Sequence, residues 1–156
     1  MPKFEKLHPV GFSAGKMFDL VADVERYPQF VPLCERLLVR SREERDGRTI
    51  LVADMTAGYK AIRETFTSRV VLNRPALAID VKYLDGPFRR LDNAWRFEPD
   101  GPESCLVRFH IDYEFSSRIL AVLMGAMFDA AFRKFTSAFE ARARAVYGPP
   151  AAGREP

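Results

Sequence analysis

The chain has 156 residues, which suits a single domain. Its composition, 47% hydrophobic and 29% charged residues, excludes a disordered protein. Its net charge of +3 tolerates an anionic membrane surface or RNA, but no block of like charge forms a nucleic-acid arm, so we expect no DNA partner. The 13 phenylalanines predict a sizeable core, or a core that contains a cavity.

The N-terminal sequence and the cysteines favour a cytoplasmic protein. The segment MPKFEKLHPVGF lacks the apolar stretch of an export signal, so we expect no disulfide between Cys34 and Cys105. The longest strictly apolar run, residues 119–128, has about 10 residues, whereas a membrane-spanning helix needs about 20. Contact with the periphery of the inner membrane stays open.

The first predicted elements are a strand over residues 3–10 and an amphipathic helix. Ser13 can cap this helix, which is expected to extend to about Val24. Two prolines in the segment 27–34 stop the helix and allow only a short second one.

Six strands are predicted next, with no helix between them. They cover residues 37–45, 49–57, 59–72, 77–83, 91–97 and 105–115. Asp46-Gly47 is the strongest short hairpin signal available, and strict alternation in the later strands predicts one buried and one solvated face. The expected sheet is an antiparallel meander without βαβ units.

A long helix is predicted from Ser117 to about Tyr147, where the apolar period becomes helical. Four phenylalanines at spacings of four, three and four fall within an arc of about 60°. They are Phe128, Phe132, Phe135 and Phe139. The opposite side of the helix is expected to carry Arg133, Glu140 and Arg144.

The predicted fold is α+β: a curved antiparallel sheet of about seven strands round a long C-terminal helix, with two short helices after the first strand. The domain is expected to span 1–148, followed by a disordered tail at 149–156. Such a sheet cannot close tightly on one helix, so the space between them is either filled by aromatic side chains or left as a ligand pocket. Because an aromatic stripe is usually ordinary core, the pocket prediction depends on the architecture.

Three groups of residues are similar to a known family. They are 18–25 with Tyr27, Pro28, Phe30, Pro32 and Cys34; then Gly86, Pro87, Phe88, Leu91, Trp95, Phe97 and Phe115; and finally 138–140, Arg142, Ala143, Tyr147 and Gly148. This pattern resembles the coenzyme Q-binding proteins of the polyketide cyclase and lipid-transfer (START-like) superfamily, which has the helix-grip fold. The bacterial branch of that family includes ribosome-association toxins. The resemblance implies an apolar pocket for a polyprenyl quinone and a role in respiration.

Fifteen residues are candidates for the lining of this pocket. They are Phe18, Tyr27, Pro28, Phe30, Pro32, Glu64, Phe66, Leu91, Asn93, Trp95, Phe109, Tyr113, Phe128, Phe132 and Phe135. Glu64 and Asn93 alternate in register with apolar residues, so each is either a buried hydrogen-bonding group or a polar anchor for a quinone carbonyl. Arg142 is expected to extend to the cavity rim.

The sequence predicts no catalytic and no metal site. Its two histidines and two cysteines lack metal-ligand spacing, and it contains neither a phosphate loop nor a nucleophile elbow. We therefore predict a binding protein that is not an enzyme, with ubiquinone or a related polyprenyl lipid as its ligand and no other cofactor. Two alternatives stay open: a ribosome-associated inhibitor of subunit joining, and an aromatic polyketide cyclase or dehydrase, which would need an acid–base pair in the cavity.

Overall fold

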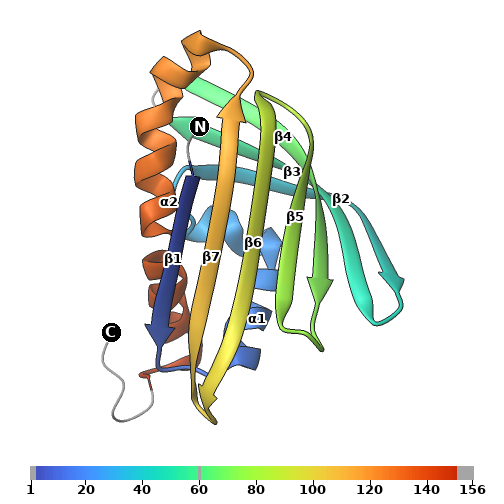
Figure 1. Cartoon of the computed structure of the whole chain (residues 1–156), viewed down its shortest axis with the longest axis vertical. Coiled ribbons are helices and arrows are strands. Elements are labelled where there is room, and N and C mark those ends of the chain that lie inside the picture. Colours follow the sequence, from blue (N-terminus) through green and yellow to red (C-terminus); the bar gives the residue numbers. More distant parts are fainter. Residues whose placement is uncertain (1–2, 60, 151–156) are drawn as a thin grey trace.

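A curved antiparallel sheet and one long helix make up most of the protein, as predicted (Figure 1). The computed structural model describes residues 3–59 and 61–150, so residues 151–156 of the predicted tail lie outside the described part. The elements in order are β1 (Lys3–Val10), α1 (Ala14–Ala22), the 3₁₀ helix η1 (Val24–Gln29), β2 (Cys34–Arg45), β3 (Arg48–Tyr59), β4 (Ile62–Asn73), β5 (Ala78–Asp85), β6 (Phe88–Gly101), β7 (Ser104–Phe115) and α2 (Arg118–Tyr147).

The sheet has seven strands in the order β1-β7-β6-β5-β4-β3-β2. Neighbours from β2 to β7 are consecutive in the chain, and β1 closes the order by pairing with β7. The β2–β3 hairpin turns at Asp46 and Gly47, whose φ angles of 52° and 77° confirm the hairpin read from this dipeptide. Register shifts with extra residues in β2, β5 and β6 accompany the curvature, because a bulge bends its strand.

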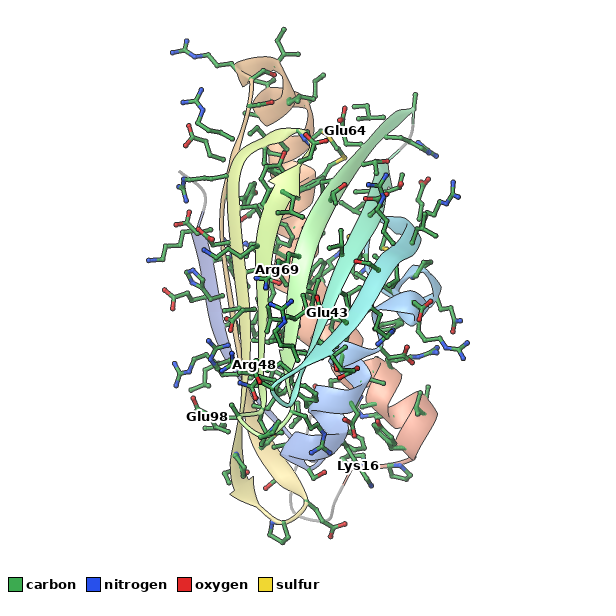
Figure 2. The ribbon with its side chains drawn as sticks, turned by 90° about the vertical axis from the view of Figure 1, so that its right-hand side faces the viewer. Lys16, Glu43, Arg48, Glu64, Arg69 and Glu98 are labelled. Atoms are coloured by element: carbon green, nitrogen blue, oxygen red, sulfur yellow. The ribbon has the colours of Figure 1, made fainter. Side chains whose placement is uncertain are left out.

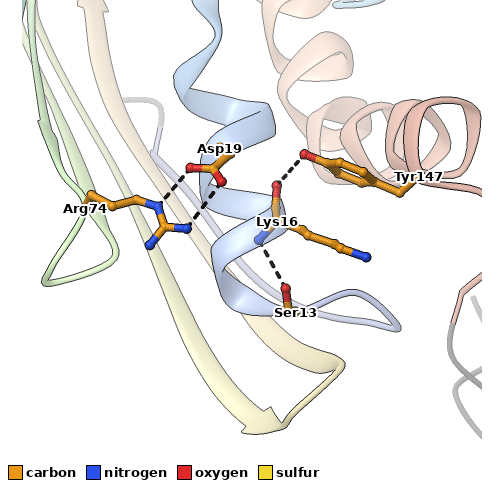
Figure 3. A network of polar contacts seen from close by, with 5 residues as sticks. All are labelled: Ser13, Lys16, Asp19, Arg74 and Tyr147. Atoms are coloured by element: carbon orange, nitrogen blue, oxygen red, sulfur yellow. Dashed lines mark hydrogen bonds and ion pairs between the residues drawn. The ribbon is translucent and has the colours of Figure 1, made fainter.

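Polar contacts cap helix α1 and join it to α2 and to the sheet (Figure 3). Ser13 caps it by accepting a hydrogen bond from the Lys16 amide at 3.2 Å, and the Tyr147 hydroxyl of α2 donates to the Lys16 carbonyl at 3.1 Å. Asp19 accepts two hydrogen bonds from Arg74, at 2.9 and 3.3 Å, which ties α1 to the turn after β4.

The short second helix begins earlier than expected. Helix α1 ends at Ala22, and η1 follows at Val24, because the Arg26 amide already donates to the Asp23 carbonyl at 3.1 Å before the first proline is reached. Pro28 lies inside η1 instead of ending the helix before it. The strands also differ from the predicted ranges by a few residues at their ends.

The aromatic stripe of α2 faces the sheet as predicted, but the solvent-facing assignment of Glu140 is wrong. Glu140 is only 5% exposed. Its carboxylate accepts a hydrogen bond from the His8 ring at 2.8 Å and lies 3.6 Å from the Arg144 guanidinium. The reason is that α2 also packs on the edge strand β1, so the helix side next to the stripe is covered as well.

Candidate ligand cavity

A cavity of about 120 Å³ lies between α2 and the concave face of the sheet. Helix α2 contributes Phe128, Ala131, Phe132, Phe135 and Phe139. The sheet contributes Ala53, Met55, Ala57, Phe66, Ser68, Val70, Ile79, Val81, Leu91, Asn93, Trp95 and Ile111. The segment around η1 completes the wall with Val24, Tyr27, Pro32, Leu33, Cys34 and Leu37.

Small side chains on the sheet explain why the space is not filled. Helix α2 packs on β1 and β7, at one side of the sheet. Further across, Ala53 and Ala57 of β3 and Ser68 of β4 point to the concave face, and their short side chains leave room below the phenylalanines of α2. Charged side chains such as Arg48 and Arg69 lie on the outside of the sheet (Figure 2).

The cavity is of the size of a single ring. An engineered apolar cavity of about 150 Å³ is known to bind benzene, so a volume of this order accepts a ring or a short aliphatic group. A long polyprenyl tail exceeds it and would have to leave through the wall. The lining residues that are only half-buried mark where the cavity comes nearest to the surface, and they include Pro32, Leu33, Leu37, Met55 and Phe135.

The cavity wall contains no charged residue among the described side chains, and its polar groups are neutral at pH 7. Burial raises the pKa of the Cys34 thiol from 9.0 to about 11. Burial also raises the pKa of Tyr27, whose hydroxyl donates to the Val21 carbonyl. One N–H of the Asn93 carboxamide donates to the His110 carbonyl at 2.8 Å. A cavity of this kind favours a neutral ligand, because an ionised group would lose its hydration without gaining a partner.

Nine of the fifteen predicted residues line the cavity. They are Tyr27, Pro32, Phe66, Leu91, Asn93, Trp95, Phe128, Phe132 and Phe135. Contact of any of them with a ligand stays a prediction.

Three further aromatic candidates lie in the packed core and not in the cavity wall. The Phe18 ring packs edge-on against Phe97, with 5.8 Å between centroids. Phe109 lies 4.7 Å from the Trp95 ring, and Tyr113 lies 5.2 Å from Phe132. For the two β7 residues the reason is the position of α2, which lies over β7 and fills the space that their side chains face.

The other three candidates lie outside the wall as well. Pro28 lies inside η1 and is exposed. Phe30 packs on Phe139 at 5.0 Å, behind the wall. Glu64 is half-buried on the inward side of β4, but it lies near the start of the strand, away from the cavity (Figure 2).

Arg142, expected at the cavity rim, is not among the residues that line the cavity. Its guanidinium donates to the Gln29 side chain at 2.7 Å and lies 5.1 Å from the Phe30 ring centroid. This contact joins the last turns of α2 to η1, next to the cavity wall.

The small wall residues and most of the aliphatic ones were not among the predicted lining residues. Ser68 was detectable, since it alternates in register with Phe66 and Val70. Ala53 and Ala57 alternate in the same way with Leu51 and Met55, but alternation shows only that they face inward and not that they border a cavity. Phe139, the last phenylalanine of the aromatic stripe, also lines the cavity.

Within the described ranges 3–59 and 61–150, no cluster of His, Cys, Asp and Glu side chains could hold a metal ion. No acidic residue or histidine stands in the cavity wall among these residues. The helices of the same ranges include none that is long and apolar enough to span a bilayer.

Comparisons with known proteins agree with this architecture. The model of the family described as polyketide cyclase / dehydrase and lipid transport matches residues 10–140. The chain is 34% identical over 149 residues to the ribosome association toxin RatA of Escherichia coli K12, covering 94% of this chain and 90% of the toxin. It is 33% identical over 150 residues to the mitochondrial coenzyme Q-binding protein of Drosophila melanogaster, covering 94% of this chain and 60% of that protein.

Solved structures show the same fold. The solution structure of an 18 kDa protein from Caulobacter crescentus has a TM-score of 0.78 and 34% identity, and the match covers 96% of this chain and all of that one. The Zhui aromatase/cyclase from Streptomyces sp. R1128 has a TM-score of 0.71 at 19% identity, with 99% of each chain covered. At that identity the likeness extends to the fold alone.

Proposed function

The chain belongs to the polyketide cyclase / dehydrase and lipid transport family, and on this basis we propose that it binds a neutral, hydrophobic ligand in the cavity between α2 and the sheet. The observation that carries the proposal is the cavity itself, which is enclosed by apolar side chains and contains no charged group in its described wall. Burial of apolar ligand surface there contributes about 25 cal/mol per Å².

The ligand in this proposal is ubiquinone or a related polyprenyl lipid. It is supported by the similarity to the coenzyme Q-binding protein of Drosophila melanogaster and by the apolar, uncharged wall of the cavity. The protein would carry the quinone for respiratory electron transport. In this proposal the protein binds its ligand without making or breaking a bond. The described cavity wall contains no carboxylate or imidazole, and burial raises the pKa of the Cys34 thiol to about 11.

Mass spectrometry of lipids that copurify from a quinone-producing host tests the proposal. We expect ubiquinone with the wild-type protein and much less of it with Ala131→Leu, which fills the cavity from α2. Ala126→Leu is the matched control, because it makes the same change on the exposed side of the same helix. Absence of quinone and of any other lipid from the wild-type protein would contradict ligand binding.

A second candidate function is association with ribosomes. It is favoured by the similarity to the toxin RatA, of which this chain covers 90%. Cosedimentation with ribosomal subunits at several salt concentrations tests it. If Ala131→Leu cosediments like the wild type, ribosome association does not need the cavity; if neither protein cosediments at low salt, the second function is excluded.

A further inference from the structure

Ser68 provides a hydroxyl without a partner in the apolar cavity wall. It lies on β4 between Phe66 and Val70, on the concave face, and the residue is 6% exposed. Within the part of the chain that the structure describes, its Oγ has no hydrogen-bond partner. A buried hydroxyl that has lost its hydrogen bonds to water and gained none in the protein lowers the stability of the fold. The stability of the fold therefore does not account for a serine at this position, whereas a ligand oxygen could accept the hydrogen bond of its hydroxyl.

Asn93 is the second neutral polar group on the sheet side of the cavity. It lies on β6, and the bond from its Nδ2 to the His110 carbonyl at 2.8 Å holds the carboxamide in place. An amide nitrogen has two N–H groups, and only one is needed for that bond. The second can serve a ligand acceptor.

The sheet register fixes the separation of the two residues. Strand β5 lies between them: Ser68 pairs with Tyr83, and Asn93 pairs with Val81. Two strand spacings of about 4.8 Å and two residues along the strand give roughly 12 Å between the two Cα atoms. Because both side chains point to the concave side, their polar ends lie closer together than that. A planar ring with oxygens on opposite edges, hydrogen-bonded at about 2.8 Å on each side, fits this interval.

We propose that Ser68 and Asn93 bind the head group of the ligand by donating hydrogen bonds to two carbonyl oxygens on opposite edges of a quinone ring. This inference rests on the proposed function and adds the chemical identity of the part that is enclosed. The cavity holds the ring, and the isoprenoid tail leaves it past the half-buried residues next to η1, such as Leu33 and Leu37. The hydroxyl of Ser68 thereby selects a ring with carbonyl groups over a plain hydrocarbon.

Ser68→Ala tests this assignment, with Tyr113→Phe as the matched control. Both substitutions remove one buried hydroxyl that has no partner among the described residues, but Tyr113 lies outside the cavity wall. Trp95 is the single tryptophan and lines the cavity, so quenching of its fluorescence measures binding directly. The probes are a ubiquinone with one isoprene unit and an isoprenoid hydrocarbon of similar size without the ring.

We expect Ser68→Ala to raise the Kd of the quinone about tenfold, the effect of one lost hydrogen bond, and to leave the Kd of the hydrocarbon within about twofold. Its denaturation midpoint should equal or exceed that of the wild type, whereas Tyr113→Phe should bind both probes like the wild type. An unchanged quinone Kd, or an equal increase in the Kd of both probes, would overturn the head-group assignment alone. Failure of the wild type to bind either probe would overturn the proposed function instead.

Discussion

Cys34 illustrates how burial alters the chemistry of a single residue in this protein. Its thiol lies in the cavity wall, contacts the Arg36 carbonyl at 3.8 Å, and has a pKa raised by burial from 9.0 to about 11. A thiol with this pKa is protonated at neutral pH and is a poor nucleophile. The residue is therefore part of the apolar wall.

The raised pKa of Cys34 predicts a pH dependence of stability. The contribution is fully present below pH 9.0, and it is lost as the pH rises toward about 11, because the unfolded chain releases the thiol proton first. Cys34→Ala should therefore lose less stability than the wild type across this window in urea unfolding experiments. Parallel pH profiles of the two proteins would contradict the assignment.

His8 and Glu140 form a buried polar pair between β1 and α2. The His8–Glu140 bond measures 2.8 Å, and the two side chains are 16% and 7% exposed. Glu140→Ala should lower the free energy of unfolding by about 1–3 kcal/mol, because it leaves the His8 ring without its hydrogen-bond partner and the Arg144 guanidinium without its counter-charge. A double-mutant cycle with His8→Ala should give a coupling energy of about 0.5–3 kcal/mol.

The solvent-exposed pair of Glu98 and Arg108 serves as the control for this cycle. Its N–O distance is 2.9 Å, but the side chains are 45% and 50% exposed. Glu98→Ala should cost less than about 1 kcal/mol, since water screens the pair. If Glu98→Ala and Glu140→Ala lower the free energy of unfolding equally, burial of Glu140 does not strengthen its contribution to stability.

At the scale of the element, the aromatic stripe of α2 combines two kinds of environment. Phe139 is 1% exposed and packs edge-on against Tyr27, Phe30 and Trp95 at 5.3, 5.0 and 5.1 Å. Phe135 is half-buried beside the cavity. Both side chains border the cavity, but only Phe135 is partly exposed to solvent. Phe139→Ala should therefore cost about 3–5 kcal/mol, and Phe135→Ala distinctly less, because the half-buried ring loses fewer contacts. Denaturant melts of the apo proteins measure both, and equal costs would mean that the stripe is uniform core.

The first turns of α2 carry exposed aliphatic side chains. Ile119, Val122 and Leu123 are 72%, 81% and 52% exposed, follow the i, i+3, i+4 spacing, and stand next to the cationic Arg118. These turns lie at the end of the molecule where β7 ends (Figure 1). Such a surface suits contact with the interface of an anionic membrane.

We expect the triple variant Ile119→Ser, Val122→Ser, Leu123→Ser to bind vesicles that contain anionic lipid at least tenfold more weakly than the wild type, since each aliphatic side chain contributes on the order of 1.5 kcal/mol when buried. Leu38→Ser, on β2 and 49% exposed, is the control and should bind like the wild type. Vesicle sedimentation measures this. Equal binding of all three proteins would place any membrane contact elsewhere.

At the scale of the whole molecule, the cavity lies between the sheet and α2, so the proposed ligand would contact both layers. A ligand that binds only the folded state stabilises it by mass action. At a concentration of 100 times Kd, a short-tailed ubiquinone should raise the free energy of unfolding by about 2.7 kcal/mol. Ala131→Leu should show no such shift in denaturant melts, and an equal shift in both proteins would locate the ligand outside the cavity.

Local sequence signals determined most of the fold. The hairpin at Asp46-Gly47, the alternation from Cys105 to Phe115 and the helical spacing of the phenylalanines in α2 each depend on residues close in the chain, and each matches the observed element. The order of elements, with no helix between the middle strands, then leaves an antiparallel sheet against one long helix. The resemblance to the family spans the same segments, and it agrees with the family that the comparisons show.

Only the tertiary structure decided which inward side chains border the cavity and which are core. Tyr113 and Ser68 both alternate onto the concave face, yet Tyr113 lies below α2 and Ser68 borders the open space, because the helix packs on the β1–β7 side of the curved sheet. Glu140 is buried for the same reason, since β1 comes from the other end of the chain. Periodicity tells which face of an element is covered, but the neighbour that covers it is set by contacts between residues far apart in sequence.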